Sequence, residues 1–332
     1  MRDVARVAGV STATVVRVVK GDARVSPSTR ASVQAVIEQL GYVPNAAARA
    51  LTSGRSRMLG LLVPNIQNPF NSSVAESMQH ALLAHGYHLV ISSVAGDGDP
   101  RRHLVSAAAD GTLAGIAMTS VRPDIDLLRL VSRRLAAVFI DQRPGIDGVD
   151  IVRTNNREVT FDAVSELIRA GHRRIALVGG PEAFDTARER RTGYADALTA
   201  SGIAFDPGLV VEGASDERGG KAATAVVLGR SEPPTAVFAY NGRVAIGVLE
   251  ATRAAGLHVP DDLSLVAFDD DPAFEVTDPP VTAVRQPTQH MGALAAELLV
   301  RQLDDPEHTR GEHVAPSQLV RRNSVGPPRS AG

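Results

Sequence analysis

The chain has 332 residues, 44% hydrophobic and 22% charged, which favours a soluble protein of two or three domains. It contains no cysteine, which excludes disulfides, zinc fingers, iron–sulfur clusters and thiol catalysis. No apolar run approaches the ~18 residues of a transmembrane helix, and no apolar leader precedes the first charged residues, so a cytoplasmic protein is expected.

Charge is unevenly distributed along the chain. Residues 1–55 carry eight Lys and Arg against three Asp and Glu, whereas residues 56–332 carry 27 against 34. A basic head on an acidic body favours contact of the head with a polyanion. Chance clustering of charge is the alternative.

The basic head predicts short helices with recognisable ends. Gly9 supplies a residue for a left-handed turn, and Ser11 and Ser26 are suited to cap the helices that follow them. Pro27 occupies the first helical position after Ser26. The pattern predicts helices over residues 3–8, 11–20, 26–40 and 46–51, followed by a linker over 52–56.

The first two helices have the layout of a helix-turn-helix. Ala5 is small where the second helix crosses the first, and Val10, Val15 and Val18 are expected to point inward. In this geometry the second helix enters the major groove, where an arginine pairs with guanine. A surface helix of an unrelated three-helix bundle is the alternative. The residues expected to contact DNA are Ser11, Thr12, Ala13, Thr14, Val16, Arg17 and Lys20.

From residue 58 onward, short apolar runs alternate with amphipathic segments. This alternation is typical of parallel sheets covered by helices on both faces, and its two similar halves indicate two lobes of one design. The predicted strands cover 58–63, 88–94, 114–120 and 136–141 in the first half, and 174–180, 209–213, 236–241 and 263–270 in the second.

Polar residues stand at or near the ends of these predicted strands. In open α/β sheets, ligands bind outside the carboxyl ends of the strands, so a cluster of polar side chains there predicts a binding cleft. The residues in such places are Asn65, Ser92, Ser93, Asp141, Asn241 and Asp269.

Linked motifs carry a resemblance over nearly the whole chain. DVARVAGVS, TVVRV, RVSPSTR and LGYVPNAAARAL are followed by GHRRIALVGGP, RERRTGYADAL and GLHVPDDLSLVAFDDDP. Together they resemble the lac repressor family (LacI/GalR) of bacterial transcription regulators. The resemblance implies an all-α helix-turn-helix domain over 1–43, a hinge helix and linker over 44–57, and an effector-binding and dimerisation body over 58–325. That body is expected to be periplasmic-binding-protein-like, with an N-lobe of about 58–152 and 283–310 and a C-lobe of about 153–282 and 311–325.

The resemblance also implies a homodimer on a palindromic double-stranded operator. Its hinge helices would enter the minor groove, with Leu51 as an apolar wedge and Asn45, Ala48 and Arg49 near it. After Arg322 the chain shows no heptads, so a dimer is expected rather than a zippered tetramer.

A small-molecule effector in the cleft between the lobes is implied as well. Arg190 with Asp269 suits a polyhydroxylated ligand, because the guanidinium donates to hydroxyls and the carboxylate accepts from them. A sugar or polyol is the first choice, and a nucleobase or nucleoside the second. The implied effector residues are Asn68, Phe70, Asn71, Asp141, Arg190, Asn241, Asp269 and Gln286; neither a cofactor nor a metal is implied.

Some positions depart from the family pattern, and other classes of protein fit the chain less well. Val16 replaces a common Ser, and Asn155, Val159 and Gly242 replace the usual Asp, Gly and Asp. A sugar-binding protein without a DNA role would leave the basic head unexplained. An enzyme is not expected, because HExxH, GxSxG and a GxGxxG after a strand are all missing and RGGKA lacks the P-loop pattern.

Overall fold

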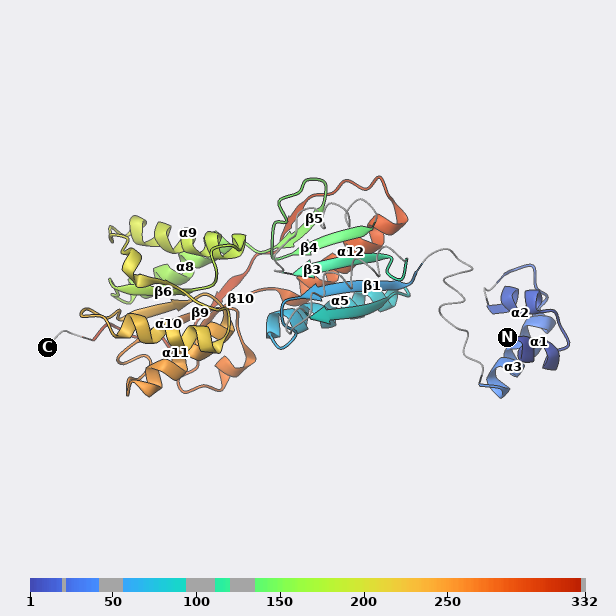
Figure 1. Cartoon of the computed structure of the whole chain (residues 1–332), viewed down its shortest axis with the longest axis horizontal. Coiled ribbons are helices and arrows are strands. Elements are labelled where there is room, and N and C mark those ends of the chain that lie inside the picture. The colour runs from blue at the N-terminus through green and yellow to red at the C-terminus, as the bar shows by residue number, and fades with distance from the viewer. Residues whose placement is uncertain (20–21, 42–55, 94–110, 120–134, 330–332) are drawn as a thin grey trace. The chain divides into compact units, whose positions relative to one another are not determined.

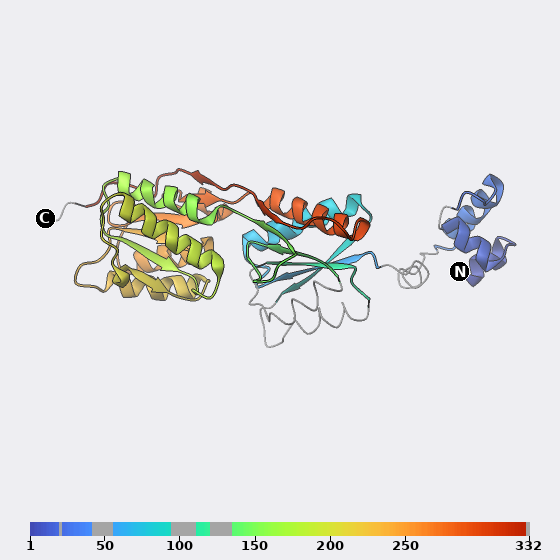
Figure 2. The ribbon, with the colours of Figure 1, turned by 90° about the horizontal axis from the view of Figure 1, so that it is seen from above.

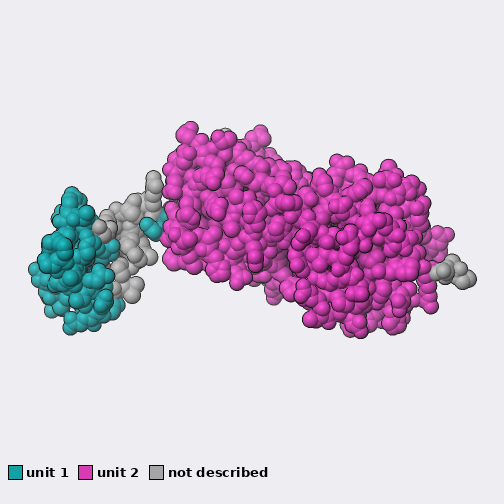
Figure 3. All heavy atoms as spheres, turned by 180° about the vertical axis from the view of Figure 1, so that it is seen from behind, with its two compact units in different colours: residues 1–57 teal, residues 58–332 magenta. Residues whose placement is uncertain are grey.

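A computed structural model of the protein describes residues 1–19, 22–41, 56–93, 111–119 and 135–329. The chain divides into two compact units, Met1–Arg57 and Met58–Gly332, which are coloured separately in Figure 3. The predicted hinge helix and five of the predicted DNA contacts lie outside the described residues. Those contacts are Lys20, Asn45, Ala48, Arg49 and Leu51.

The described residues of the first unit form three helices around a small apolar core. Val4, Val15 and Val33, one from each helix, are fully buried. Gly9 has a φ of 64° between the first two helices, and Ser11 Oγ accepts from the Thr14 N–H at 3.1 Å. The first three predicted helices and the caps at Ser11 and Ser26 are therefore confirmed. The helices are α1 (Arg2–Val7), α2 (Thr12–Val19) and α3 (Pro27–Gln39).

The second unit contains two six-stranded sheets with the same strand order (Figure 1). All neighbouring strands are parallel except β10 and β12, which are antiparallel. The first sheet, in spatial order, is β11 (Glu312–Val314), β5 (Asp150–Arg153), β4 (Ala136–Ile140), β3 (Gly115–Thr119), β1 (Met58–Val63) and β2 (His88–Ser93). The second is β12 (Gln318–Val320), β10 (Thr282–Arg285), β9 (Ser264–Phe268), β8 (Ala236–Ala239), β6 (Ile175–Gly179) and β7 (Val210–Glu212).

Helices cover these sheets and bury their apolar faces. The helices α5 (Pro69–Ala84) and α12 (Thr288–Asp304) share one core with the first sheet. On the second sheet, α8 (Asn156–Arg169) and α9 (Asp185–Ala200) share one core, and α10 (Glu217–Leu228) and α11 (Gly242–Ala254) share another. No helix among the described residues is long and apolar enough to cross a membrane.

The chain passes between the two lobes three times, at about residues 154–155, 286–287 and 315–317. Figure 2 shows the last crossing, near the C-terminal end of the chain. Asn155 Oδ1 accepts from the Ser317 N–H at 2.8 Å and so joins two of the crossings. Because these connecting segments are short, the two lobes lie next to each other.

The expected lobe boundaries are wrong at two strands. The strand β10 lies in the second sheet, although residues from 283 onward are expected in the first lobe. The strand β11 lies in the first sheet, although residues from 311 onward are expected in the second lobe. Both strands have only three or four residues, and backbone pairing rather than a long apolar run places them in their sheets.

Candidate functional site

The helix α2 has one face in the core of the first unit and one face in solvent. Val15 and Val18 are buried, whereas Val16 is half-buried and lies outside that core. The outward face therefore consists of the residues predicted to contact DNA. Of these, Ser11, Thr12, Ala13 and Arg17 are exposed, and Thr14 and Val16 are half-buried.

Asp22, shortly after α2, forms an ion pair with Arg24. Asp22 accepts a two-pronged contact from Arg24, at 3.0 Å from Nε and 2.8 Å from Nη2, and this contact lowers the pKa of Asp22. The Arg17 side chain makes no hydrogen bond to another residue that the structure describes. Its guanidinium therefore stays available for a base edge or a phosphate.

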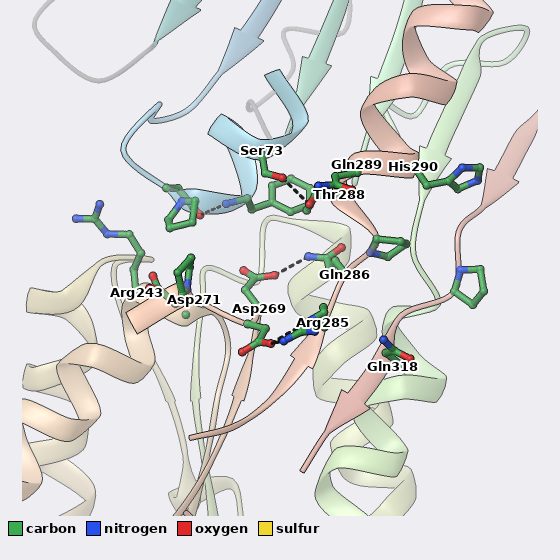
Figure 4. A pocket seen from close by; sticks show the side chains of 18 residues that line it. Ser73, Arg243, Asp269, Asp271, Arg285, Gln286, Thr288, Gln289, His290 and Gln318 are labelled. Atoms are coloured by element: carbon green, nitrogen blue, oxygen red, sulfur yellow. Dashed lines mark hydrogen bonds and ion pairs between the residues drawn. The ribbon is translucent and has the colours of Figure 1, made fainter. Parts of the chain in front are cut away.

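A cleft of about 590 Å³ lies between the two lobes of the second unit (Figure 4). The first turns of α5, α11 and α12 border it together with the loop that follows β9. Four of the predicted effector residues line it: Asn68, Phe70, Asp269 and Gln286.

Asp269 and Gln286 form a hydrogen-bonded pair in the wall of the cleft. Gln286 Nε2 donates to Asp269 Oδ1 at 2.6 Å, and Gly242, at the start of α11, donates its backbone N–H to the same carboxylate. Burial raises the pKa of Asp269. Gln286 Oε1 is buried without a hydrogen-bond partner among the described residues. An unpaired buried acceptor is costly, so this oxygen is suited to a donor on a ligand.

Asp141 and Arg190 face each other across the lobes. Asp141 follows β4 in the first lobe, Arg190 belongs to α9 in the second, and Oδ2 lies 3.6 Å from Nη2. The other carboxylate oxygen of Asp141 has no hydrogen-bond partner within the described part of the chain. Burial raises the pKa of Asp141 to about 7, because desolvation outweighs the attraction of Arg190.

Arg190 is held by contacts that sequence reasoning missed. Its Nε donates to Asn156 Oδ1 at 2.8 Å, and its Nη1 donates to the Tyr240 carbonyl at 2.9 Å. The guanidinium lies 3.5 Å from the centre of the Phe268 ring. Asn156 and Phe268 carry no local signal for this role, since the fold alone brings them to α9.

Asp141 and Asp269 share an unusual backbone conformation. They have φ values of 56° and 65°, and they are the only non-glycine residues with positive φ among those that the structure describes. Asp141 directly follows β4, and Asp269 directly follows β9. These two strands occupy the same position, third from the edge, in their sheets, counted from β11 and from β12. Strained backbone of this kind concentrates at functional sites.

Four of the predicted effector residues do not line the cleft: Asp141 and Arg190, which pair with each other, and Asn71 and Asn241. Asn71 is buried within the first lobe, where its Nδ2 donates to the Asn65 carbonyl at 2.9 Å and its Oδ1 accepts from Thr119 at 3.1 Å. Asn241 instead caps α11, accepting from the Val244 N–H at 2.8 Å. Both side chains support the walls of the cleft rather than line it.

The cleft also contains charged residues that were not predicted. Arg285 Nε donates to Asp270 at 2.7 Å. Arg322 donates to the same carboxylate from Nη1 at 2.7 Å and from Nη2 at 3.0 Å. Arg243 pairs with Glu217 at 2.6 Å. Arg285 ends β10, a strand that the apolar pattern did not reveal. Among the described residues, no group of three His, Asp or Glu side chains is arranged to hold a metal ion.

Comparisons with known proteins agree with this architecture. Residues 1–45 match the family "Bacterial regulatory proteins, lacI family", and residues 164–325 match "Periplasmic binding protein-like domain". The chain is 33% identical to the HTH-type transcriptional regulator GalR of Escherichia coli, covering 99% of this chain and 96% of GalR.

Two solved structures are similar over almost the full length. The transcriptional regulator CelR–cellobiose complex is 33% identical, with a TM-score of 0.76 and coverage of 97% and 98%. The lac repressor dimer bound to operator and the anti-inducer ONPF is 26% identical, with a TM-score of 0.85 and coverage of 98% of both chains.

Proposed function

The chain belongs to the lacI family of bacterial regulatory proteins, and we propose that it reads its operator through α2 and is controlled by a sugar or related polyol in the cleft. As a member of this family it is a DNA-binding transcription regulator under small-molecule control. The proposal concerns which residues contact each partner and which class of effector binds.

The exposed face of α2 supports the proposed operator contact. Ser11, Thr12, Ala13 and Arg17 would enter the major groove, with Arg17 on a guanine edge. Thr14 and Val16 would border the same contact, and Lys20 would reach a phosphate. The proposed hinge residues Asn45, Ala48, Arg49 and Leu51 would act in the minor groove.

A homodimer on a palindromic site is part of this proposal. The lac repressor structure is a dimer bound to its operator, and a two-fold dimer presents two copies of α2 to two half-sites. We place the protein in the bacterial cytoplasm, with its DNA. The relatives reported above are transcriptional regulators, and ligand binding without turnover is proposed for the cleft.

The observation that carries the effector class is a pair of unpartnered acceptor oxygens, one on Gln286, which lines the cleft, and one on Asp141, which does not line it. Ligand hydroxyls would satisfy both oxygens, with Asp269 as a further acceptor. The related CelR was solved with cellobiose, which is rich in hydroxyl donors. Phe70 is the only Phe, Tyr or Trp among the described residues that line the cleft, so an aromatic clamp for a flat nucleobase is not supported.

A thermal-shift screen of uncharged sugars and nucleosides tests this proposal. We expect a sugar to raise the melting temperature and the double variant Asp141→Asn, Asp269→Asn to abolish that rise. The matched control is Asp262→Asn, which removes a carboxylate that the His258 N–H and Arg329 already occupy and that does not line the cleft. If a sugar raises the melting temperature of the double variant as much as that of the parent chain, the binding site lies elsewhere. If only nucleosides raise the melting temperature, the proposed effector class is wrong.

A further inference from the structure

Four charged side chains form a closed ring that joins the two lobes beside the cleft. Arg143 follows β4, Arg153 ends β5 and Glu312 begins β11, so all three belong to the first lobe. Glu189 lies on α9 and is the one member from the second lobe. None of the four lines the cleft itself.

Charges alternate around this ring. Arg143 donates to Glu312 from Nε at 2.9 Å and from Nη2 at 3.0 Å, and it donates to Glu189 Oε1 from Nη1 at 2.5 Å. Arg153 donates to Glu312 Oε1 at 2.8 Å and closes the ring with a contact to the second oxygen of Glu189. Each carboxylate therefore binds both guanidinium groups.

Two members of the ring are more shielded from solvent than the partners of an ordinary surface ion pair. The side chains of Arg153 and Glu189 are only 11% and 20% exposed. The hydrogen bond from Arg143 lowers the pKa of Glu312, so this carboxylate stays ionised well below neutral pH. Charge-assisted hydrogen bonds in a network of this kind are stronger than isolated exposed pairs.

The ring holds the helix that carries Arg190. Glu189 and Arg190 are adjacent on α9, and the Arg143 backbone N–H donates to Asp185, the first residue of the same helix, at 2.9 Å. The first turns of α9 thus contact the first lobe at Asp185 and Glu189, next to the pairing of Arg190 with Asp141.

We propose that Glu189 is a positioning residue for effector binding. The ring holds α9 against the first lobe and so fixes the Arg190 guanidinium opposite Asp141, at the spacing of the lobes that the effector requires. This inference rests on the proposed function, because Asp141 and Arg190 are assigned there to the effector site. Glu189 acts through Arg190 and need not touch the ligand.

Glu189→Gln tests the ring, and Glu166→Gln is its matched control. Glu166 also accepts from two arginines, Arg169 at 2.6 Å and Arg321 at 2.9 Å, and its side chain is 19% exposed. All three of these residues lie in the second lobe, so the control removes the same chemistry without affecting a contact between lobes.

The absence of cysteine allows a direct distance measurement between the lobes. Spin labels at Glu297→Cys on α12 and Arg253→Cys on α11 occupy exposed positions, one in each lobe. Dilution with unlabelled chain removes signals between protomers. We expect pulsed dipolar spectroscopy to give one distance distribution for the parent and Glu166→Gln, and a broader or shifted one for Glu189→Gln. Arg143→Gln removes one of the two guanidinium contacts of Glu189 and leaves that of Arg153, so it should change the distribution in the same direction but by less. Superimposable distributions for all four proteins would overturn the proposal.

Cellobiose binding, measured by calorimetry, provides the second readout. We expect Glu189→Gln to weaken binding about fivefold or more relative to Glu166→Gln, in the usual range of coupling between sites. Equal affinities in the two variants would show that the ring does not position the site. If the parent chain binds no cellobiose, the titration is made with a sugar that the thermal-shift screen identifies. If no sugar binds, the proposed effector class is in error, and the distance measurement still decides whether the ring holds the lobes.

Discussion

Two carboxylates and one guanidinium meet where the lobes face each other. Asp141 is buried and Asp269 is half-buried, and the charge of Arg190 lowers the pKa of each, but desolvation raises it more. One arginine cannot compensate two desolvated acids fully. The protonation of Asp141 is therefore expected to change near neutral pH.

Replacing Asp141 by Asn should remove a pH-dependent component of stability. The pKa of Asp141 rises from 3.8 to about 7 on folding, so between these values the native state binds more protons than the unfolded state. The contribution of Asp141 to the free energy of unfolding therefore falls as pH rises through this window. Urea unfolding at pH 5, 6, 7 and 8 should show Asp141→Asn gaining relative to the parent as pH rises. Parallel profiles for the two proteins would contradict this.

The buried His172 should impose the opposite dependence. Its Nδ1 lies 2.9 Å from the Thr235 hydroxyl and its Nε2 lies 2.9 Å from the Gly326 carbonyl, and burial lowers its pKa. The unfolded state then binds the proton more readily, so stability is complete above about pH 6.5 and falls below it. In melting experiments below pH 6.5, the His172→Gln variant should no longer show this loss of stability. The His80→Gln variant, changed at an exposed position on α5, should still show it.

Arg17 is the side chain on which operator recognition most depends in this scheme. A two-pronged contact to guanine contributes about 1–3 kcal/mol of discrimination, so Arg17→Ala should reduce specific binding about fivefold or more. Mobility shifts with a palindromic site selected from random DNA measure this. Arg6→Ala, which removes an exposed arginine of α1, should change binding much less. Retention of full sequence specificity by Arg17→Ala would contradict the assignment.

At the scale of elements, the apolar runs predicted eight strands within one or two residues. Six of these strands are buried in a parallel sheet over most of their length, whereas β2 and β7 are partly exposed edge strands. The apolar runs missed β5, β10, β11 and β12, which have three or four residues and depend on backbone pairing. Reading polar residues at strand ends found Asp141 and Asp269. It did not find Asn156 or Arg285, which reach the site only through the folded helix and an unrecognised strand.

The turn between α1 and α2 makes its own prediction. Gly9 has a φ of 64°, and the space that a methyl group would take there is open, so only backbone strain opposes a side chain at this position. Gly9→Ala should destabilise the first unit by about 1 kcal/mol. Faster hydrogen exchange at the Val10 N–H, which donates to the Ala5 carbonyl at 3.0 Å, would report this. Gly311→Ala, with open space and no positive φ, should leave that exchange unchanged.

At the scale of the whole molecule, a basic head is joined to an acidic body. DNA binding through the head should weaken steeply with salt, because each neutralised phosphate releases counterions. Lys20→Ala should lower the slope of log affinity against log salt by about 0.9 if Lys20 contacts one phosphate. Filter binding across a salt series measures the slope. An unchanged slope would show that Lys20 makes no phosphate contact.

The three crossings between lobes have a consequence for synthesis on the ribosome. Neither lobe is encoded as one continuous stretch, and the first lobe needs Met291, Ala295 and Leu299 of α12 to complete its core. The lobe that begins at residue 58 therefore stays unfinished until α12, and finally β11, have left the exit tunnel. The head, whose core comes from residues 1–37, is free to fold first. A nascent chain stalled near residue 280 should thus have a folded head and an incomplete first lobe. The apolar residues of that lobe would then be exposed to chaperones.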